Sequence, residues 1–180
     1  TTDSKHNLPK YDNLTCGLLP TGINQIWASD ITYVRLNNTF IYLAIVMDLF
    51  SRKIIGWAVS KFIDENLTIA ALNTALESRI VSPGLIHHSD QGVQYASLKY
   101  TNLLTHNNIK ISMSRKANPY DNAFLESFMK TIKQEEIYMN EYDDINDAIL
   151  NMGNFIEEVY NKKDCTRHLV MSHRMIMNSH

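Results

Sequence analysis

The amino-acid sequence predicts an α/β domain in which a mixed five-stranded sheet is flanked by helices. Near the start of the chain, three segments rich in β-branched and aromatic residues follow one another with short turns between them. Further along, short apolar segments alternate with segments of helical periodicity. The chain has 180 residues, of which 44% are hydrophobic, and this is enough for one domain with a full-sized core.

The first three predicted strands cover residues 26–34, 40–47 and 53–60. Asn37 and Asn38 predict a turn after the first strand, and residues 48–52 predict a turn after the second. Because these connections are short, the three strands are expected to form an antiparallel meander. Residues 1–24 mix Pro and Gly with polar residues without a sustained period, so an extended leader is predicted there.

Helices and two further strands alternate after the meander. Asp64 is the predicted cap of a helix that runs to about Ser78. The apolar stripe of this helix is Ile69, Leu72, Leu76 and Ile80. A fourth strand is predicted at 85–89, a helix at 98–106 and a fifth strand at 109–113.

Two longer helices are predicted in the last third of the chain. The run Asn118-Pro119-Tyr120-Asp121 places a capping residue before a Pro at the first helical position, so a helix is expected from there to about Glu136. The last helix is predicted at about 143–160. Its apolar residues at helical spacing are Ile145, Ile149, Met152, Ile156 and Val159.

The composition argues against a membrane protein and against a disulfide-rich secreted protein. No apolar run approaches the roughly 20 residues that span a bilayer, and residues 1–5 carry no apolar signal segment. Cys16 and Cys165 are too few and too far apart to indicate a disulfide framework. We therefore expect a soluble, cytoplasmic protein with free thiols and no membrane partner.

The charge is unevenly distributed. The net charge is −2 and the pI about 6.3, whereas phosphate binding usually leaves a basic footprint. Residues 110–133, however, hold five Lys and Arg against two acids, and residues 134–158 hold eight acids and no Lys or Arg. The acidic stretch can be a solvated helix face, or positive charge can be reserved for one surface near residues 110–133.

Three acids stand out by their positions. Asp30 lies inside the first predicted strand, where a charge is costly unless it is exposed or paired. Asp90 directly follows the fourth strand, and Glu126 lies in the long helix with Lys130 and Lys133 on the same face. Each alone has an ordinary structural explanation, such as a turn aspartate or a helix glutamate paired with lysine. Their coincidence favours a shared site.

Four segments carry a resemblance to a known family: Trp27–Tyr33, Asp48–Trp57, His87–Tyr95 and Ser112–Phe128. They resemble the retroviral integrase superfamily and, within it, the bacterial insertion-sequence transposases of family three. Thirty-five residues separate Asp90 from Glu126, as in that superfamily, and Lys133 also falls on the family pattern. The resemblance covers about residues 25–160, which it identifies as an integrase catalytic core.

The resemblance implies a ribonuclease-H-like fold and a polynucleotidyl transferase that cleaves and joins DNA during transposition. It assigns Asp30, Asp90 and Glu126 as catalytic residues and as ligands of two Mg²⁺ or Mn²⁺ ions. Asp30 would bridge both ions, while Asp90 and Glu126 would each help to hold one. Carboxylates without His or Cys suit these hard cations, which prefer oxygen ligands. The implied partners are transposon ends, target DNA and further copies of the chain.

The resemblance also suggests DNA contacts. Lys130 and Lys133 match positions that contact phosphates, although solvation of a helix face is the ordinary alternative. The segment before the long helix offers further candidates, several of which can instead serve as turn or cap: Arg115, Lys116, Asn118, Tyr120 and Asn122. Asp48 is expected to hold a turn rather than a metal. His87 and His88 are not needed as ligands, and one of them is expected to be buried and hydrogen-bonded.

The sequence departs from the family pattern in its leader and in its tail, and two rival hypotheses for its function are open. No helix-turn-helix is recognisable in the leader, so sequence-specific end recognition is expected to be missing. In the tail, residues 161–180, Met171-Ser172-His173-Arg174 stands where the family has a Ser-Pro pair. One rival is a ribonuclease-H-like nuclease that only hydrolyses. The other is an inactive transposase remnant that only binds DNA, and the retention of all three acids argues against it.

Overall fold

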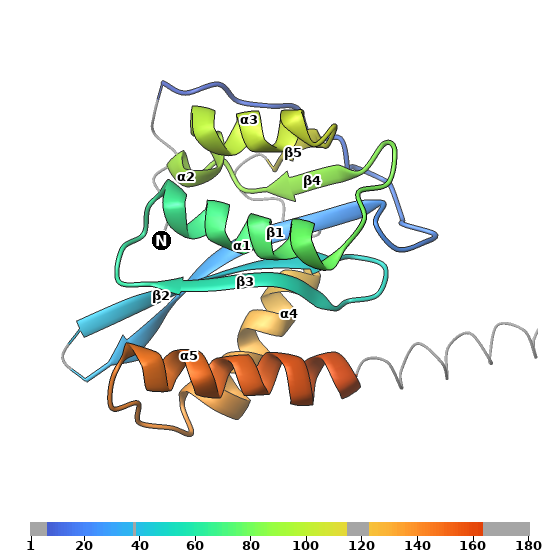
Figure 1. The fold of residues 1–180 in the computed structure, drawn as a ribbon. Helices are drawn as coiled ribbons and strands as arrows, with labels where there is room; N and C mark the ends of the chain where they lie inside the picture. The colour runs from blue at the N-terminus through green and yellow to red at the C-terminus, as the bar shows by residue number, and fades with distance from the viewer. Residues whose placement is uncertain (1–6, 38, 115–122, 164–180) are drawn as a thin grey trace, which may run out of the picture.

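A five-stranded mixed sheet separates two layers of helices in the computed structural model, which describes residues 7–37, 39–114 and 123–163 (Figure 1). Its strands are β1 (Ile26–Leu36), β2 (Thr39–Asp48), β3 (Ile54–Ser60), β4 (Ile86–Ser89) and β5 (Lys110–Met113), in the spatial order β3-β2-β1-β4-β5. The predicted α/β class and the antiparallel meander of the first three strands are confirmed.

β1 is paired on both sides only near its start. Along one edge β1 pairs with β2 from Trp27 to Leu36, which is all of the strand except its first residue. Along the other edge it pairs in parallel with β4 through Ile26, Trp27 and Ala28 alone, and β4 pairs in parallel with β5. Asp30 therefore lies just beyond the point at which β1 and β4 part.

One face of the sheet is covered by α1 (Glu65–Ser78), α2 (Val93–Ala96) and α3 (Leu98–His106). Asp64 caps α1 as predicted, because its Oδ1 accepts the Leu67 N–H at 3.1 Å. A Cβ on Gly56 of β3 would lie 2.3 Å from the Ala71 carbonyl oxygen, so this glycine lets α1 pack directly on the sheet. The short helix α2 was not predicted.

The expected stripe of α1 was partly wrong. Ile80 is 87% exposed because the helix ends at Ser78 and Arg79 is already extended. Burial instead centres on small residues, with Ala71 and Ala75 buried beside Leu67 and Leu72. Small side chains there allow the close approach to β3 that Gly56 completes.

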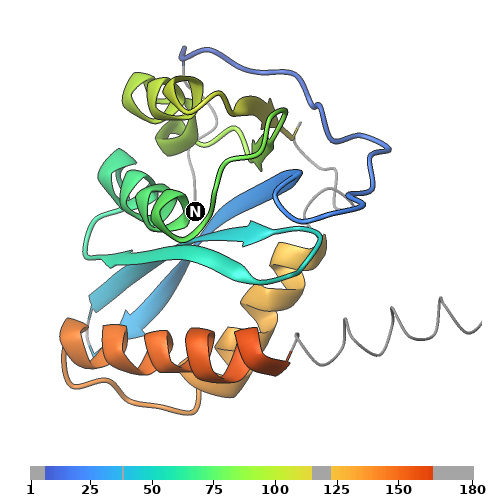
Figure 2. The same ribbon diagram turned by 45° about the vertical axis from the view of Figure 1, so that its right-hand side comes forward.

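The opposite face is covered by α4 (Ala123–Ile132), η1 (Lys133–Ile137), α5 (Ile145–Asn154) and η2 (Phe155–Tyr160) (Figure 2). The two η elements are π-helical turns that extend α4 and α5 to about the predicted ends, near Glu136 and Tyr160. The wide turn after Asn154 adds Phe155 to the buried residues beside the predicted Met152 and Ile156. The predicted helix start at Asn118 lies outside the described residues.

The described part of the leader packs against the sheet. The Leu14 N–H donates to Ser112 Oγ at 2.8 Å, and the Met113 N–H donates to the Asp12 carbonyl at 3.3 Å, so this segment lies along β5. At the other edge, the Asn161 amide binds both the N–H and the carbonyl of Ile54 on β3. In the described ranges, no helix is both long and apolar enough to cross a membrane.

Candidate active site

Asp30 is held in the middle of β1 with little freedom. Its side chain is partly buried, and its Oδ1 accepts the N–H of the next residue, Ile31, at 2.8 Å. The neighbours of Asp30 on the same face of the strand, Ala28 and Thr32, are buried. The carboxylate thus emerges from the sheet at the edge left open by β4.

Asp90 and Glu126 come from two other elements. Asp90 follows the last residue of β4, and its Oδ1 accepts the Gly92 N–H at 2.8 Å, which shapes the turn into α2. Glu126 lies in the first turn of α4, whose buried side chains are Leu125, Phe128, Met129 and Ile132. Because those residues hold α4 on the sheet, the exposed Glu126 is left on the rim.

The three carboxylates line one cleft of about 580 Å³. Lys130, on α4, and Lys133, the first residue of η1, line the same cleft, as their helical offsets from Glu126 predict. The other lining residues are Ile31, Thr32, Tyr33, Met129, Gln134 and Tyr138. The cleft therefore gathers acids from β1, from the end of β4 and from α4, with two lysines beside them.

Burial raises the pKa of Asp30 from 3.8 to about 6. The negative charges of Asp90 and Glu126 add to this increase, whereas the Ile31 N–H and the Lys133 ammonium oppose it. The ionised Asp30 is therefore short of compensating positive charge. A cation bound beside it would supply that charge and favour the carboxylate.

The donor set suits a hard divalent cation, but the side chains do not converge on a finished site. Among the described residues, no three His, Cys, Asp or Glu side chains are close enough together to hold a metal ion. Ionised carboxylates repel one another, so their close approach requires a cation between them. Asp30, Asp90 and Glu126 share the cleft and are the residues that could hold a metal.

Three neighbouring polar residues have structural roles. Asp48 is fully buried and accepts the Asn24 N–H at 2.6 Å and the Ser51 N–H at 2.7 Å, which confirms that it holds the turn. His87 and His88 are both buried. Burial, together with the neighbouring His88, lowers the pKa of His87 to about 3, so its ring is neutral.

The hydrogen bonds of the two histidines tie together distant segments. Nε2 of His87 lies 2.8 Å from both Ser29 Oγ and the Tyr100 hydroxyl. Nδ1 of His88 lies 2.9 Å from Ser112 Oγ and 3.2 Å from Thr15 Oγ1. These contacts fix β4, and with it the start of the turn that carries Asp90.

Sequence reasoning found the acids but missed two aromatic residues of the cleft. Tyr33 is 50% exposed and Tyr138 is 71% exposed. Neither position offered a signal: Tyr33 lies three residues after Asp30 on one strand, a spacing that points the two side chains to opposite faces, and the position of Tyr138 depends on the wide turn of η1. The other predicted DNA contacts lie outside the described residues: Arg115, Lys116, Asn118, Tyr120 and Asn122.

Comparison with known families decides the classification. The model of the integrase core domain matches residues 20–119, and a second integrase core domain model matches residues 107–163. The chain belongs to the integrase core domain family. The two matches together reach from the end of the leader through η2, and they include Asp30, Asp90 and Glu126.

Sequence relatives of this integrase core domain come from insertion elements. It is 40% identical over 164 residues to an uncharacterized 31 kDa protein of insertion element IS600 from Shigella sonnei, with 91% of the chain and 60% of the relative covered. It is 41% identical over 143 residues to the transposase of insertion sequence element IS904 from Lactococcus lactis, with 79% and 56% covered. The chain thus spans a little over half the length of these relatives.

A solved structure agrees with the fold. The catalytic core domain of HTLV-2 integrase, in complex with magnesium and in a dimeric form, superposes with a TM-score of 0.52 at 21% sequence identity. The match covers 79% of this chain and 83% of the HTLV-2 domain. The predicted ribonuclease-H-like fold is therefore confirmed for this integrase core domain.

Proposed function

We propose that this chain is the catalytic core of a DNA transposase, a polynucleotidyl transferase that cleaves DNA strands and joins them to target DNA. The observation that carries the proposal is the meeting of Asp30, Asp90 and Glu126 in one cleft beside two lysines. Membership of the integrase core domain family and similarity to the IS904 transposase support it. Residues 25–160 form the catalytic unit in this proposal, between a leader and a tail.

Asp30, Asp90 and Glu126 would hold Mg²⁺ or Mn²⁺, most simply as two ions. Their oxygen donors fit these cations, and the magnesium complex of the HTLV-2 domain is consistent with that choice. When bound, the ions stabilise the attacking and leaving oxygens of an in-line displacement at phosphorus. The protein supplies the fixed carboxylates, with Asp30 held by its strand and Asp90 by its turn.

Lys130 and Lys133 would bind the phosphates on either side of the reacting bond. Both lie in the cleft on the rim formed by α4 and η1, so they can orient the DNA strand across the carboxylates. Phosphate contacts carry no sequence information, and the DNA would be positioned rather than read. The active complex would contain more than one copy of the chain, by analogy with the dimeric HTLV-2 domain.

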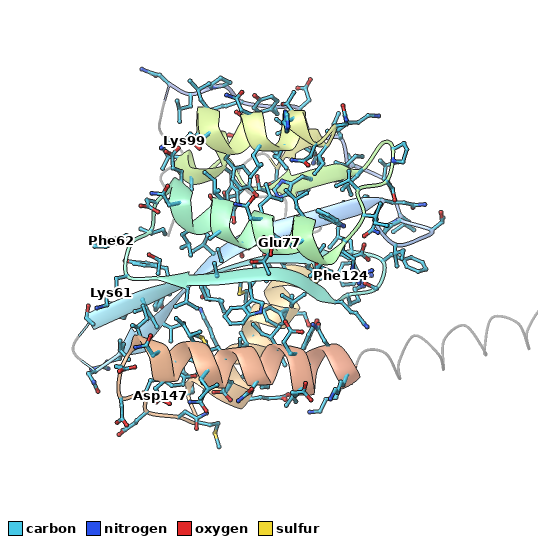
Figure 3. All side chains as sticks on the ribbon, in the orientation of Figure 1. Lys61, Phe62, Glu77, Lys99, Phe124 and Asp147 are labelled. Carbon is cyan, nitrogen blue, oxygen red and sulfur yellow. The ribbon has the colours of Figure 1, made fainter. Side chains whose placement is uncertain are left out.

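A product analysis separates this function from plain hydrolysis. The chain is incubated in Mg²⁺ with a transposon-end duplex that is already nicked to leave a 3′-hydroxyl, together with target DNA. We expect strands joined covalently to the target. Asp90→Asn should abolish joining, whereas Glu77→Gln, which changes an exposed acid on α1 across the sheet, should leave it intact (Figure 3). Cleaved but never joined products would favour a nuclease and refute the proposal.

A further inference from the structure

A second hollow of about 550 Å³ adjoins the cleft of the three carboxylates. Tyr33 and Tyr138 line both, so these two side chains form the boundary between the hollows. The remaining residues around the second hollow are Arg35, Asn37, Ile137, Asn140, Glu141 and Tyr142. A molecule held at the carboxylates can therefore extend past the two tyrosines without leaving the surface.

Both tyrosines are exposed, and contacts hold the ring of Tyr33 and the backbone of Tyr138. The Tyr33 ring packs edge-to-face against Phe40, with centroids 5.7 Å apart and an interplanar angle of 86°. Lys133 Nζ lies 4.9 Å from the centroid of the same ring. The Tyr138 N–H donates to the Lys133 carbonyl at 2.9 Å, so the wide turn of η1 fixes its backbone beside that lysine. Flat apolar surface is thus presented next to a cation.

The charges of the two hollows differ, and this indicates what each would hold. The first contains Lys130 and Lys133 beside three acids, and the proposed divalent ions would offset those acids, so with the ions bound it would attract phosphate. The second contains one Arg and one Glu, Arg35 and Glu141, so it offers no net positive charge to a second phosphate. An uncharged, flat group attached to a phosphate fits this pattern. In a DNA substrate that group is a nucleobase.

We propose that Tyr33 and Tyr138 form a stacking subsite for one nucleobase that has left the duplex beside the reacting phosphodiester. The inference rests on the proposed function, because it needs DNA in the carboxylate cleft. Aromatic stacking tolerates any base, since every base has a π-face, and it favours nucleotides that are already unpaired. The subsite would therefore select DNA ends that open easily, without reading their sequence.

Binding of two probe duplexes tests the subsite. One duplex is fully paired, and the other has the same sequence on one strand but mispaired nucleotides at its reacting end. Affinities are measured by fluorescence anisotropy in Ca²⁺ buffer. We expect the full chain to bind the mispaired end more tightly. Tyr33→Ala and Tyr138→Ala should each reduce that preference by about 5- to 150-fold, the range given by loss of one base stack.

Matched variants test whether the tyrosine rings themselves cause the preference for the mispaired end. Tyr138→Phe keeps the ring and should keep the preference, and Lys130→Ala should weaken both duplexes alike. Phe62→Ala removes an aromatic side chain with the same 71% exposure, which projects from the β3–α1 connection away from α4, and it should change nothing (Figure 3).

Three outcomes overturn the inference, and they distinguish its failure from failure of the proposed function. Equal affinity of the wild-type chain for both duplexes, in a chain that still joins strands, refutes the subsite alone. Equal weakening of both duplexes by Tyr138→Ala also refutes it. A chain that neither binds DNA nor joins strands refutes the subsite and the proposed function together.

Discussion

Replacing Asp30 by Asn should make the metal-free protein more stable at neutral and alkaline pH. Asn has nearly the same shape as Asp but carries no charge, so it removes the charge that burial and the two other acids disfavour. The pKa of Asp30 rises from 3.8 to about 6 on folding, which means that the folded state binds this proton more tightly than the unfolded state. The ionised group therefore destabilises the fold.

The magnitude follows from the size of that shift. Each unit corresponds to about 1.4 kcal/mol, so ionised Asp30 lowers the free energy of unfolding by about 3 kcal/mol above pH 6. The penalty falls as pH drops from 6 towards 3.8, to about 0.5 kcal/mol at pH 4. In a domain of this size, about 3 kcal/mol corresponds to a rise in Tm of about 6–12 °C.

Urea unfolding in excess chelator at pH 8 and at pH 4 measures this effect directly. Asp30→Asn should be the more stable protein at pH 8 by about 3 kcal/mol, with most of the difference gone at pH 4. Glu77→Gln, an exposed acid on α1, serves as the control and should stay within about 0.5 kcal/mol at both pH values. Equal stability of Asp30→Asn and wild type at pH 8, or a gain that grows towards low pH, would refute the electrostatic reasoning.

Other predictions concern the metal, the DNA contacts and the core. Mg²⁺ and Mn²⁺ should support strand joining in gel assays, whereas Ca²⁺ should support at most DNA binding, because the longer bonds of Ca²⁺ impose a looser coordination geometry. Efficient joining in Ca²⁺ would contradict this prediction. Lys130→Ala and Lys133→Ala should each weaken binding to a terminal-repeat duplex and to a scrambled duplex by the same factor. Each should also reduce the slope of log K against log salt concentration by about one unit per lost phosphate contact. A loss of affinity for the terminal repeat alone would contradict this prediction. Gly56→Ala should lower the free energy of unfolding by about 2 kcal/mol or more, since its Cβ would lie 2.3 Å from the Ala71 carbonyl oxygen; an unchanged urea midpoint would contradict the packing.

The elements that could be predicted from sequence are those set by local chemistry. The three β-branched strands with short turns and the Asp64 cap of α1 follow from neighbouring residues, and the structure has them as expected. The end of α1 was misjudged at Ile80, because apolar periodicity continued past the point where the backbone becomes extended. The wide turns η1 and η2 lie where the sequence predicts ordinary helix, since π-helical turns are rare and have no local signal in the sequence.

The candidate site also contains residues that could be found from the sequence and residues that could not. Asp30, Asp90 and Glu126 could be picked out by their positions and spacing, and the cleft brings them together. Tyr33 and Tyr138 could not be paired from sequence, because their proximity depends on the open edge of β1 and on the turn that follows Lys133. Long-range placement of this kind is decided by the tertiary fold.

The central claim is that Asp30, Asp90 and Glu126 together hold the divalent ions that drive transfer of a DNA strand. The most direct test follows joining of pre-nicked ends over a Mg²⁺ titration, for the wild type and for Asp30→Asn, Asp90→Asn and Glu126→Gln, each checked for folding by circular dichroism. Joining should require Mg²⁺ in the wild type and be absent in all three variants at every concentration. Near wild-type joining by any one folded variant, or full activity in excess chelator, would contradict the claim.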